Sequence, residues 1–355
     1  MTWLDAQADN DMNSQVHERN LMAREEGSCK WLLTHPTFHD WLNAEGEGIQ
    51  SKLWLRGPPG IGKSFLCSTA IAHVSHDLDC ITLYHLCRFD DQFGSGAGVD
   101  DPSSGVRAAT LLVHQLFRHF WQQDRQIAMP VSAYIKTVNK TMSSLTEATR
   151  LIIRHGYGYA QEKGRLSHAE SLRLFIFLDG LDENGDTKAG AKVLQLFDNL
   201  EKELPVIQKT WISSREKYAL SQLLREWPFI SGDDLTEADV KEFLAKSVPN
   251  FGSTAEAGRE VDGQPSKNIL NAPLEPTQNL LTTLHIVDDW ILEKLQMRAK
   301  GNFLYARLMV NWLKDDVFTV DDIMDLLVSR VPDKITEMYR RIFLQYQRDQ
   351  HKYTR

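Results

Sequence analysis

The sequence has few of the features that mark secreted, zinc-binding or membrane-spanning proteins. Its four cysteines, Cys29, Cys67, Cys80 and Cys87, form no Cys-x-x-Cys pair, so their spacing indicates neither a disulfide framework nor a zinc site. No apolar run approaches the roughly 20 residues that a membrane-spanning helix needs. The polar, acidic first residues carry no signal-peptide pattern. These absences predict a cytoplasmic protein with no membrane partner.

An excess of positive charge is also missing. The 355 residues carry 40 Lys and Arg against 48 Asp and Glu, which gives a net charge of −8 at neutral pH. Proteins that bind nucleic acid usually present a basic surface, so this balance argues against a nucleic-acid partner. The hydrophobic content of 42% and the charged content of 25% are those of an ordinary globular protein.

Three regions of the chain differ in their residue pattern. Residues 1–50 are predicted to form a helical lead-in. Residues 51–232 alternate short apolar strands with helices, which predicts an α/β core with a parallel sheet flanked by helices. Residues 233–355 are predicted to form an α-helical subdomain with a long loop at 252–277, which is rich in Gly, Pro, Ser and Glu.

A phosphate-binding motif, GxxxxGK[ST], lies between the first predicted strand of the core and the helix that follows. Its residues are Gly57, Pro58, Pro59, Gly60, Ile61, Gly62, Lys63 and Ser64. The glycines let backbone N–H groups turn inward around phosphates, and the start of the helix adds partial positive charge. Lys63 is expected to bridge the β- and γ-phosphates, and the Ser64 hydroxyl to ligate Mg²⁺. The motif predicts a P-loop NTPase core that binds a nucleoside triphosphate with Mg²⁺.

Acidic residues follow the most apolar predicted strand, Leu172–Leu178. Asp179 comes directly after it and is predicted to bind Mg²⁺ together with Ser64, because ligands of open α/β sheets bind at the carboxyl ends of the strands. Asp182 and Glu183 are predicted to position or polarise the attacking water. Glu183 is favoured as the base by analogy with other P-loop ATPases.

A later predicted strand, Val206–Ser213, runs into Ser214 and Arg215. A guanidinium at this edge of the sheet is suited to contact a γ-phosphate, so Arg215 is predicted to distinguish a triphosphate from a diphosphate. An ordinary surface ion pair is the alternative for this residue.

With these elements in order, the chain resembles the NACHT family of NLR-like signal-transduction NTPases. It is most similar to the fungal branch, whose P-loop region resembles the N-terminal domain of nephrocystin-3-like proteins. The resemblance is carried by GSCKWLL from Gly27, LWLRGPPGIGKS, FIFLDGLDEN and WISSRE. It implies a switch in signalling or innate-immunity-like recognition that hydrolyses ATP slowly, with GTP possible as the nucleotide, and that self-associates in the triphosphate state. Lys63, Ser64, Asp179 and Arg215 carry over by position.

The predicted helical subdomain departs from this family. Many related receptors have a Gly-x-Pro that contacts the nucleotide, whereas this chain has Gly301-Asn302-Phe303. The sequence also ends at Arg355, before the winged-helix segment that carries a nucleotide-contacting histidine in the family. A truncated regulatory fragment, or a module that binds nucleotide without turnover, is therefore the main alternative. A small-molecule kinase would need an acceptor pocket, and a motor ATPase would show polymer-stimulated turnover.

Overall fold

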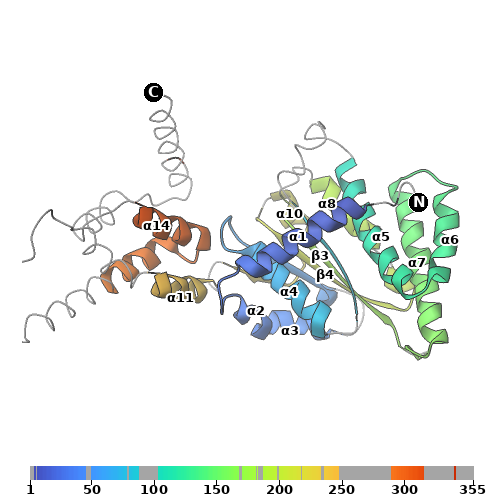
Figure 1. Cartoon of the computed structure of the whole chain (residues 1–355), viewed down its shortest axis with the longest axis horizontal. Coiled ribbons are helices and arrows are strands. Elements are labelled where there is room, and N and C mark those ends of the chain that lie inside the picture. The colour runs from blue at the N-terminus through green and yellow to red at the C-terminus, as the bar shows by residue number, and fades with distance from the viewer. Residues whose placement is uncertain are drawn as a thin grey trace, which may run out of the picture. The chain divides into compact units, whose positions relative to one another are not determined.

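The computed structural model divides the chain into two compact units (Figure 1). The first comprises Met1–Pro58 and Lys63–Gly232, and the second comprises Pro59–Gly62 and Asp233–Arg355. The structure describes residues 4, 6–44, 49–77, 80–87, 103–167, 170–180, 182, 187–197, 200–216, 218–232, 236–247, 289–315 and 340.

The first unit is built on a parallel sheet of five strands in the order β2-β3-β4-β1-β5. The strands are β1 (Lys52–Arg56), β2 (Ile81–Leu86), β3 (Leu172–Asp179), β4 (Val206–Ser214) and β5 (Phe229–Ser231). All four pairings are parallel, and Ser213 of β4 is in register with Asp179 on one side and Leu55 on the other. The carboxyl ends of β1, β3 and β4 therefore lie at one edge of the sheet. The predicted α/β fold with a parallel sheet is confirmed.

Helices cover both faces of this sheet. They are α1 (Gln7–Ala23), α2 (Lys30–Thr34), α3 (Pro36–Asn43), α4 (Lys63–Asp77), α5 (Ser103–Gln123), α6 (Arg125–Ile135), α7 (Met142–Glu162), α8 (Thr187–Phe197), α9 (Leu200–Glu203) and α10 (Tyr218–Leu223), with a 3₁₀ turn η1 at Ile49–Ser51. Helix α4 contacts β2, β3 and β4, and α3 contacts β1 and β5. Figure 1 shows α1 lying along α4.

Successive side chains of β3 point to opposite faces of the sheet and pack into two different apolar layers, as expected for a buried parallel strand. On one face, the rings of Phe175 and Phe177 contact Trp41 of α3 edge-on, with centroids 5.6 Å and 5.9 Å away. On the other face, Ile176 and Leu178 join a cluster that includes Leu112 of α5. From residue 174 onward, β3 is therefore buried on both faces.

The outer edge of β2 is hydrogen-bonded to side chains of two helices. The Asn13 amide of α1 donates to the Tyr84 carbonyl (2.9 Å), and its oxygen accepts from Leu86 N–H (2.9 Å). The Gln115 amide of α5 donates to the same carbonyl (3.0 Å) and accepts from Tyr84 N–H (2.9 Å). Two amide side chains thus occupy positions where a neighbouring strand would bond.

Two helical segments differ from the prediction. No helix was predicted over Arg125–Ile135, yet α6 forms there with Pro130 inside it. Proline removes one backbone hydrogen bond, and burial of Val131 and Ile135 on the same helix offsets this loss. The apolar pattern of Ala191–Leu204 predicts one helix, whereas the structure divides this segment into α8 and α9. The Gly, Ser, Asp and Pro content of Phe89–Gly105 predicts a loop. Residues 89–102 lie outside the described part of the chain, and α5 begins within the predicted loop, at Ser103.

The described part of the second unit is helical, as predicted for the segment after the core. It contains α11 (Glu237–Ser247), a helix over 289–299 and α14 (Phe303–Asp315). Their shared core consists of Val240, Leu244, Ile291, Leu295, Ala299, Tyr305, Ala306, Met309, Val310 and Leu313. The residue patterns of Asp321–Leu327 and Lys334–Gln347 also predict helices. These two segments and the predicted loop at 252–277 lie outside the described residues, apart from residue 340.

The helices within the described ranges are all too short or too polar to cross a membrane. The cytoplasmic location stays a prediction.

Candidate nucleotide-binding site

The P-loop joins the end of β1 to the start of α4. Gly60 and Gly62 have φ angles of 89° and 90°, a left-handed conformation that glycine adopts without a steric penalty. Lys63 is the first residue of α4, and its ammonium donates to the carbonyls of Gly57 and Pro58, both at 2.9 Å. The loop thus curls around the cation that is predicted to bind phosphate.

Gly60 is also required by its neighbours within the second unit. A Cβ atom at this position would lie 2.5 Å from Oδ1 of Asn302. The Asn302 amide donates to the Pro59 carbonyl (2.8 Å), and its oxygen accepts from Tyr305 N–H (2.9 Å) near the start of α14. Asn302 is the middle residue of Gly301-Asn302-Phe303, in which Phe303 stands where the Gly-x-Pro pattern has proline, and its amide binds the P-loop backbone at Pro59.

Asp179 is held firmly at the end of β3. Its carbonyl accepts from Cys87 N–H (2.9 Å), while the next residue, Gly180, has a φ of 69° and donates to the Ser213 carbonyl (2.9 Å). The side chain is only 3% exposed. A buried carboxylate at a strand end is costly unless a cation or hydrogen bonds stabilise it.

The first turns of α4 lie near this carboxylate. Cys67, one turn after Lys63, has a thiol whose pKa is raised well above its ordinary value, first by burial and then by the negative charge of Asp179. A hydrogen bond with Ser213, the register partner of Asp179, opposes this shift. The helix that begins with Lys63 and Ser64 is therefore close to Asp179.

The donor set at this edge fits Mg²⁺. Mg²⁺ prefers oxygen ligands, and in nucleotide sites it takes one or two from the protein and the rest from phosphates and water. The hydroxyl of Ser64 and the carboxylate of Asp179 are oxygen donors of this kind, on α4 and at the end of β3.

Asp182 and Arg215 form a pair at the same edge. The Asp182 side chain is 1% exposed and lies 3.3 Å from Arg215 Nε, and it also accepts from Arg215 N–H (3.1 Å). The ion pair considered for Arg215 is therefore present, although it is with a buried partner rather than a surface one. Arg215 is 40% exposed. Glu183 lies outside the described residues.

Two residues that the sequence did not single out reach α4 from α1. The Asn20 amide donates to the Ser68 hydroxyl (3.0 Å) and lies 3.5 Å from the Ser64 carbonyl. Arg24 donates to the Thr69 hydroxyl (3.0 Å). No apolar pattern pointed to them, because α1 is polar around most of its surface and buries only Asn13 and Val16.

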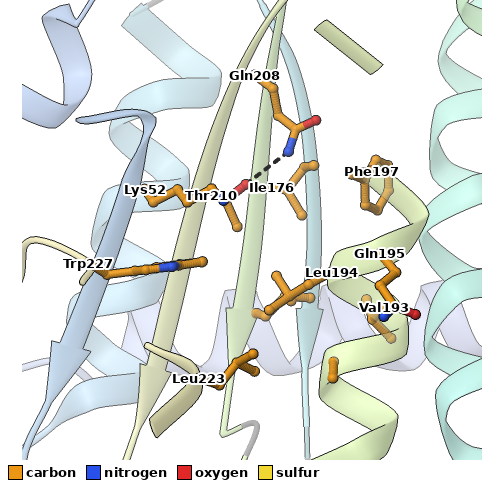
Figure 2. A pocket seen from close by; sticks show the side chains of 12 residues that line it. Lys52, Ile176, Val193, Leu194, Gln195, Phe197, Gln208, Thr210, Leu223 and Trp227 are labelled. Atoms are coloured by element: carbon orange, nitrogen blue, oxygen red, sulfur yellow. Dashed lines mark hydrogen bonds between the residues drawn. The ribbon is translucent and has the colours of Figure 1, made fainter. Parts of the chain in front are cut away.

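A separate cavity of about 190 Å³ lies on the other face of the sheet (Figure 2). Its lining includes Ile176 and Leu178, which belong to the apolar layer against α5 and α8, not to the layer against α3. The Lys52 ammonium lies 5.5 Å from the centre of the Trp227 ring, and the Gln208 amide donates to the Thr210 hydroxyl (3.2 Å). Cys67 of α4 approaches Ser213 and Asp179 instead, so this cavity is distinct from the P-loop site.

A family model described as nephrocystin 3, N-terminal, matches residues 27–215, more than half of the chain. The matched segment includes the P-loop, Asp179 and Arg215, and it confirms the resemblance predicted from the sequence. No curated protein matches the chain. Among solved structures, C. elegans PCH-2 is similar over 91% of this chain and 68% of its own, with 14% identity and a TM-score of 0.30.

Proposed function

We propose that this chain, which belongs to the family of the nephrocystin 3 N-terminal domain, binds ATP with Mg²⁺ and hydrolyses it slowly as a molecular switch. The chain carries a P-loop NTPase domain of NACHT type. The observation that carries the proposal is the P-loop that opens into α4 beside the buried Asp179. GTP is the alternative nucleotide.

Each P-loop residue has a defined task in this proposal. Lys63 exchanges its two carbonyl acceptors, Gly57 and Pro58, for phosphate oxygens, which bind an ammonium more strongly because they are charged. The Ser64 hydroxyl and the Asp179 carboxylate are the residues that would hold Mg²⁺. The ion, when bound, neutralises negative charge on the β- and γ-phosphates.

Glu183 is the proposed base that orients the attacking water. The neighbouring acid, Asp182, has its two oxygens directed at the backbone and guanidinium of Arg215, so it is better placed to hold Arg215 than to activate water. Arg215 is proposed to contact the γ-phosphate with the part of its guanidinium that is exposed.

The proposed switch links the triphosphate state to self-association of the chain. Slow hydrolysis suits this role, since the lifetime of the triphosphate form then sets the lifetime of the assembly. The family membership and the P-loop support this part of the proposal. A module that binds nucleotide without turnover is the second candidate, and it differs only in lacking hydrolysis and the change in assembly.

Binding is tested with fluorescent analogues of ATP and GTP, titrated against the wild-type chain and Lys63→Ala in the presence of Mg²⁺. Loss of a charge-assisted contact to two phosphates is expected to weaken binding by at least about a hundredfold. Lys163→Ala, at an exposed position of the first unit, is the matched control and should bind as the wild type does. Equal binding by Lys63→Ala would place the nucleotide site elsewhere.

Hydrolysis is tested by single-turnover assays of the wild type and Glu183→Gln, with light scattering in each nucleotide state. Glu183→Gln should bind nucleotide normally and lose hydrolysis. If the wild type binds nucleotide without hydrolysing it, the binding-only module is favoured. If it hydrolyses nucleotide but its mass by light scattering is the same in every nucleotide state, the proposed switch is excluded.

A further inference from the structure

Helix α1 lies outside the segment that the family model matches, yet it contacts the P-loop helix. The match begins at residue 27, and α1 spans Gln7–Ala23. Only Asn13 and Val16 of its 17 residues are buried. Little apolar area therefore holds α1 in place, and its position depends on directional polar contacts.

Some of these contacts are made with α5, where Arg107 pairs with Asp9 and Arg118 donates to Gln7, and others fall on the first two turns of α4. Asn20 donates to Ser68, whose side chain is fully buried, and lies at the limit of hydrogen-bond distance from the carbonyl of Ser64. Arg24 donates to Thr69, and the Thr69 hydroxyl donates to the Phe65 carbonyl (2.8 Å). Ser64, Ser68 and Thr69, in the first two turns of α4, thus face α1.

A second group of hydrogen bonds, at the edge strand β2, fixes how α1 is placed. Asn13 exchanges two hydrogen bonds with β2, through Tyr84 and Leu86. Asn13 and Asn20 are seven residues apart in the helix, which is nearly two full turns, so both face the same side of α1. Binding of Asn13 to the sheet edge therefore presents Asn20 to α4.

We propose that α1 is a docked positioning helix for the phosphate-binding turn, with Asn20 as the positioning residue that couples docking of α1 to occupancy of the nucleotide site. This rests on the proposed nucleotide binding. Ser64 carries the hydroxyl that would ligate Mg²⁺, and Asn20 acts on its carbonyl and on the residue one turn later. Coupling is reciprocal, so nucleotide binding must also tighten the docking of α1.

The size of the coupling follows from the contacts. A net hydrogen bond changes an equilibrium constant by about two- to tenfold. Helix α1 is held mainly by polar contacts with α4, α5 and β2 and buries one valine. A change of this size at α4 is therefore expected to be a measurable part of its docking. A helix packed through a broad apolar face would not respond in this way.

The first test measures affinity for fluorescent ATP with Mg²⁺ and with EDTA, together with the urea midpoint of the nucleotide-free chain. Asn20→Ala is expected to weaken binding by about three- to tenfold with Mg²⁺ and much less in EDTA. Asn20→Asp, which places a carboxylate next to a carbonyl and a hydroxyl, should weaken it further. Gln15→Ala removes an amide from an exposed position of the same helix and should leave both affinities unchanged.

The outcomes separate this inference from the proposed function. Failure of the wild type to bind any nucleotide would overturn both. Normal wild-type binding with an unchanged ratio of Mg²⁺ to EDTA affinities in Asn20→Ala and Asn20→Asp would overturn the role of Asn20 alone. A lower urea midpoint with that unchanged ratio would also count against it, because a merely structural residue behaves in this way.

The second test follows amide hydrogen exchange of residues 7–23 with and without MgATP. Nucleotide is expected to slow exchange along α1 in the wild type and in Gln15→Ala, and to slow it clearly less in Asn20→Ala when all samples are saturated. Equal protection of α1 in the wild type and Asn20→Ala would overturn the coupling.

Discussion

Helix α4 meets the sheet on one side and α1 on the other, and the two interfaces differ in chemistry. Toward the sheet it buries Leu66, Cys67, Ala70, Ile71 and Val74, none more than 1% exposed. Toward α1 it presents Ser68 and Thr69, which accept hydrogen bonds from Asn20 and Arg24. The apolar interface gains stability from area and resists opening, whereas the polar one depends on direction and is readily exchanged for water. The contact of the P-loop helix with the sheet is thus expected to be rigid, and its contact with α1 to open more easily.

The strongest test of the fixed interface is the reactivity of Cys67. Alkylation needs a thiolate, and burial together with Asp179 raises the pKa of this thiol well above its ordinary value. Its labelling in the native protein should be at least about a thousandfold slower than in urea, because it requires opening of the core. Site-resolved mass spectrometry measures the rate, with the half-buried Cys80 as the internal comparison. Labelling of Cys67 as fast as Cys80 would mean that the apolar interface also opens readily.

Leu66→Ala should be the most destabilising substitution of this series. It leaves a cavity between α4 and its neighbours at a site that is 1% exposed, and such changes cost about 2–5 kcal/mol. Urea unfolding gives the free energy. Met22→Ala, at an exposed position of α1, is the control and should change it by less than about 0.5 kcal/mol.

Ser68→Ala addresses the polar interface from the α4 side. The variant removes the better acceptor of Asn20 and keeps the Ser64 carbonyl, so a loss of about 0.5–1.5 kcal/mol is expected in the same urea experiment. A loss of unfolding free energy as large as that of Leu66→Ala would mean that the polar interface with α1 contributes as much stability as the apolar interface with the sheet.

The smallest effect is a dependence on pH through His17 of α1. Burial lowers the pKa of this imidazole below its ordinary 6.5, with Glu18 opposing the shift, and its ring lies 5.3 Å from that of Tyr84. Because the folded form favours neutral imidazole, the contribution of His17 is complete above about pH 6.5 and is lost as the pH falls below it. Comparing urea unfolding of the wild type and His17→Gln at about pH 7.5 and about pH 5.5 isolates this term. An identical pH response in both proteins would exclude His17 as its source.

The elements that the sequence predicted well are those whose pattern is local. Leu172–Leu178 is apolar at every position but Arg173, and a fully buried parallel strand requires such a run. The P-loop is specified by glycines with positive φ and by the lysine that opens α4. Both could be predicted because the physical requirement and the residues that meet it are adjacent in the chain.

The features that the sequence did not predict depend on distant contacts. Asp182 and Arg215 are 33 residues apart, and only the ends of neighbouring strands β3 and β4 bring them together. The docking of α1 could not be predicted from apolar periodicity, because the polar side chains of Asn13 and Asn20 make its contacts with β2 and α4. No helix was predicted over α6, where burial of Val131 and Ile135 offsets the hydrogen bond that Pro130 removes.

The amides of Asn13 and Gln115 on β2 have a consequence for how copies of this chain can meet. An uncovered outer strand offers a row of N–H and C=O groups on which another chain can add its own strand, a common route to aggregation. Here Tyr84 N–H, Tyr84 C=O and Leu86 N–H already have partners. Growth of the sheet past β2 would first have to break these bonds, which protects this edge of the first unit against strand addition.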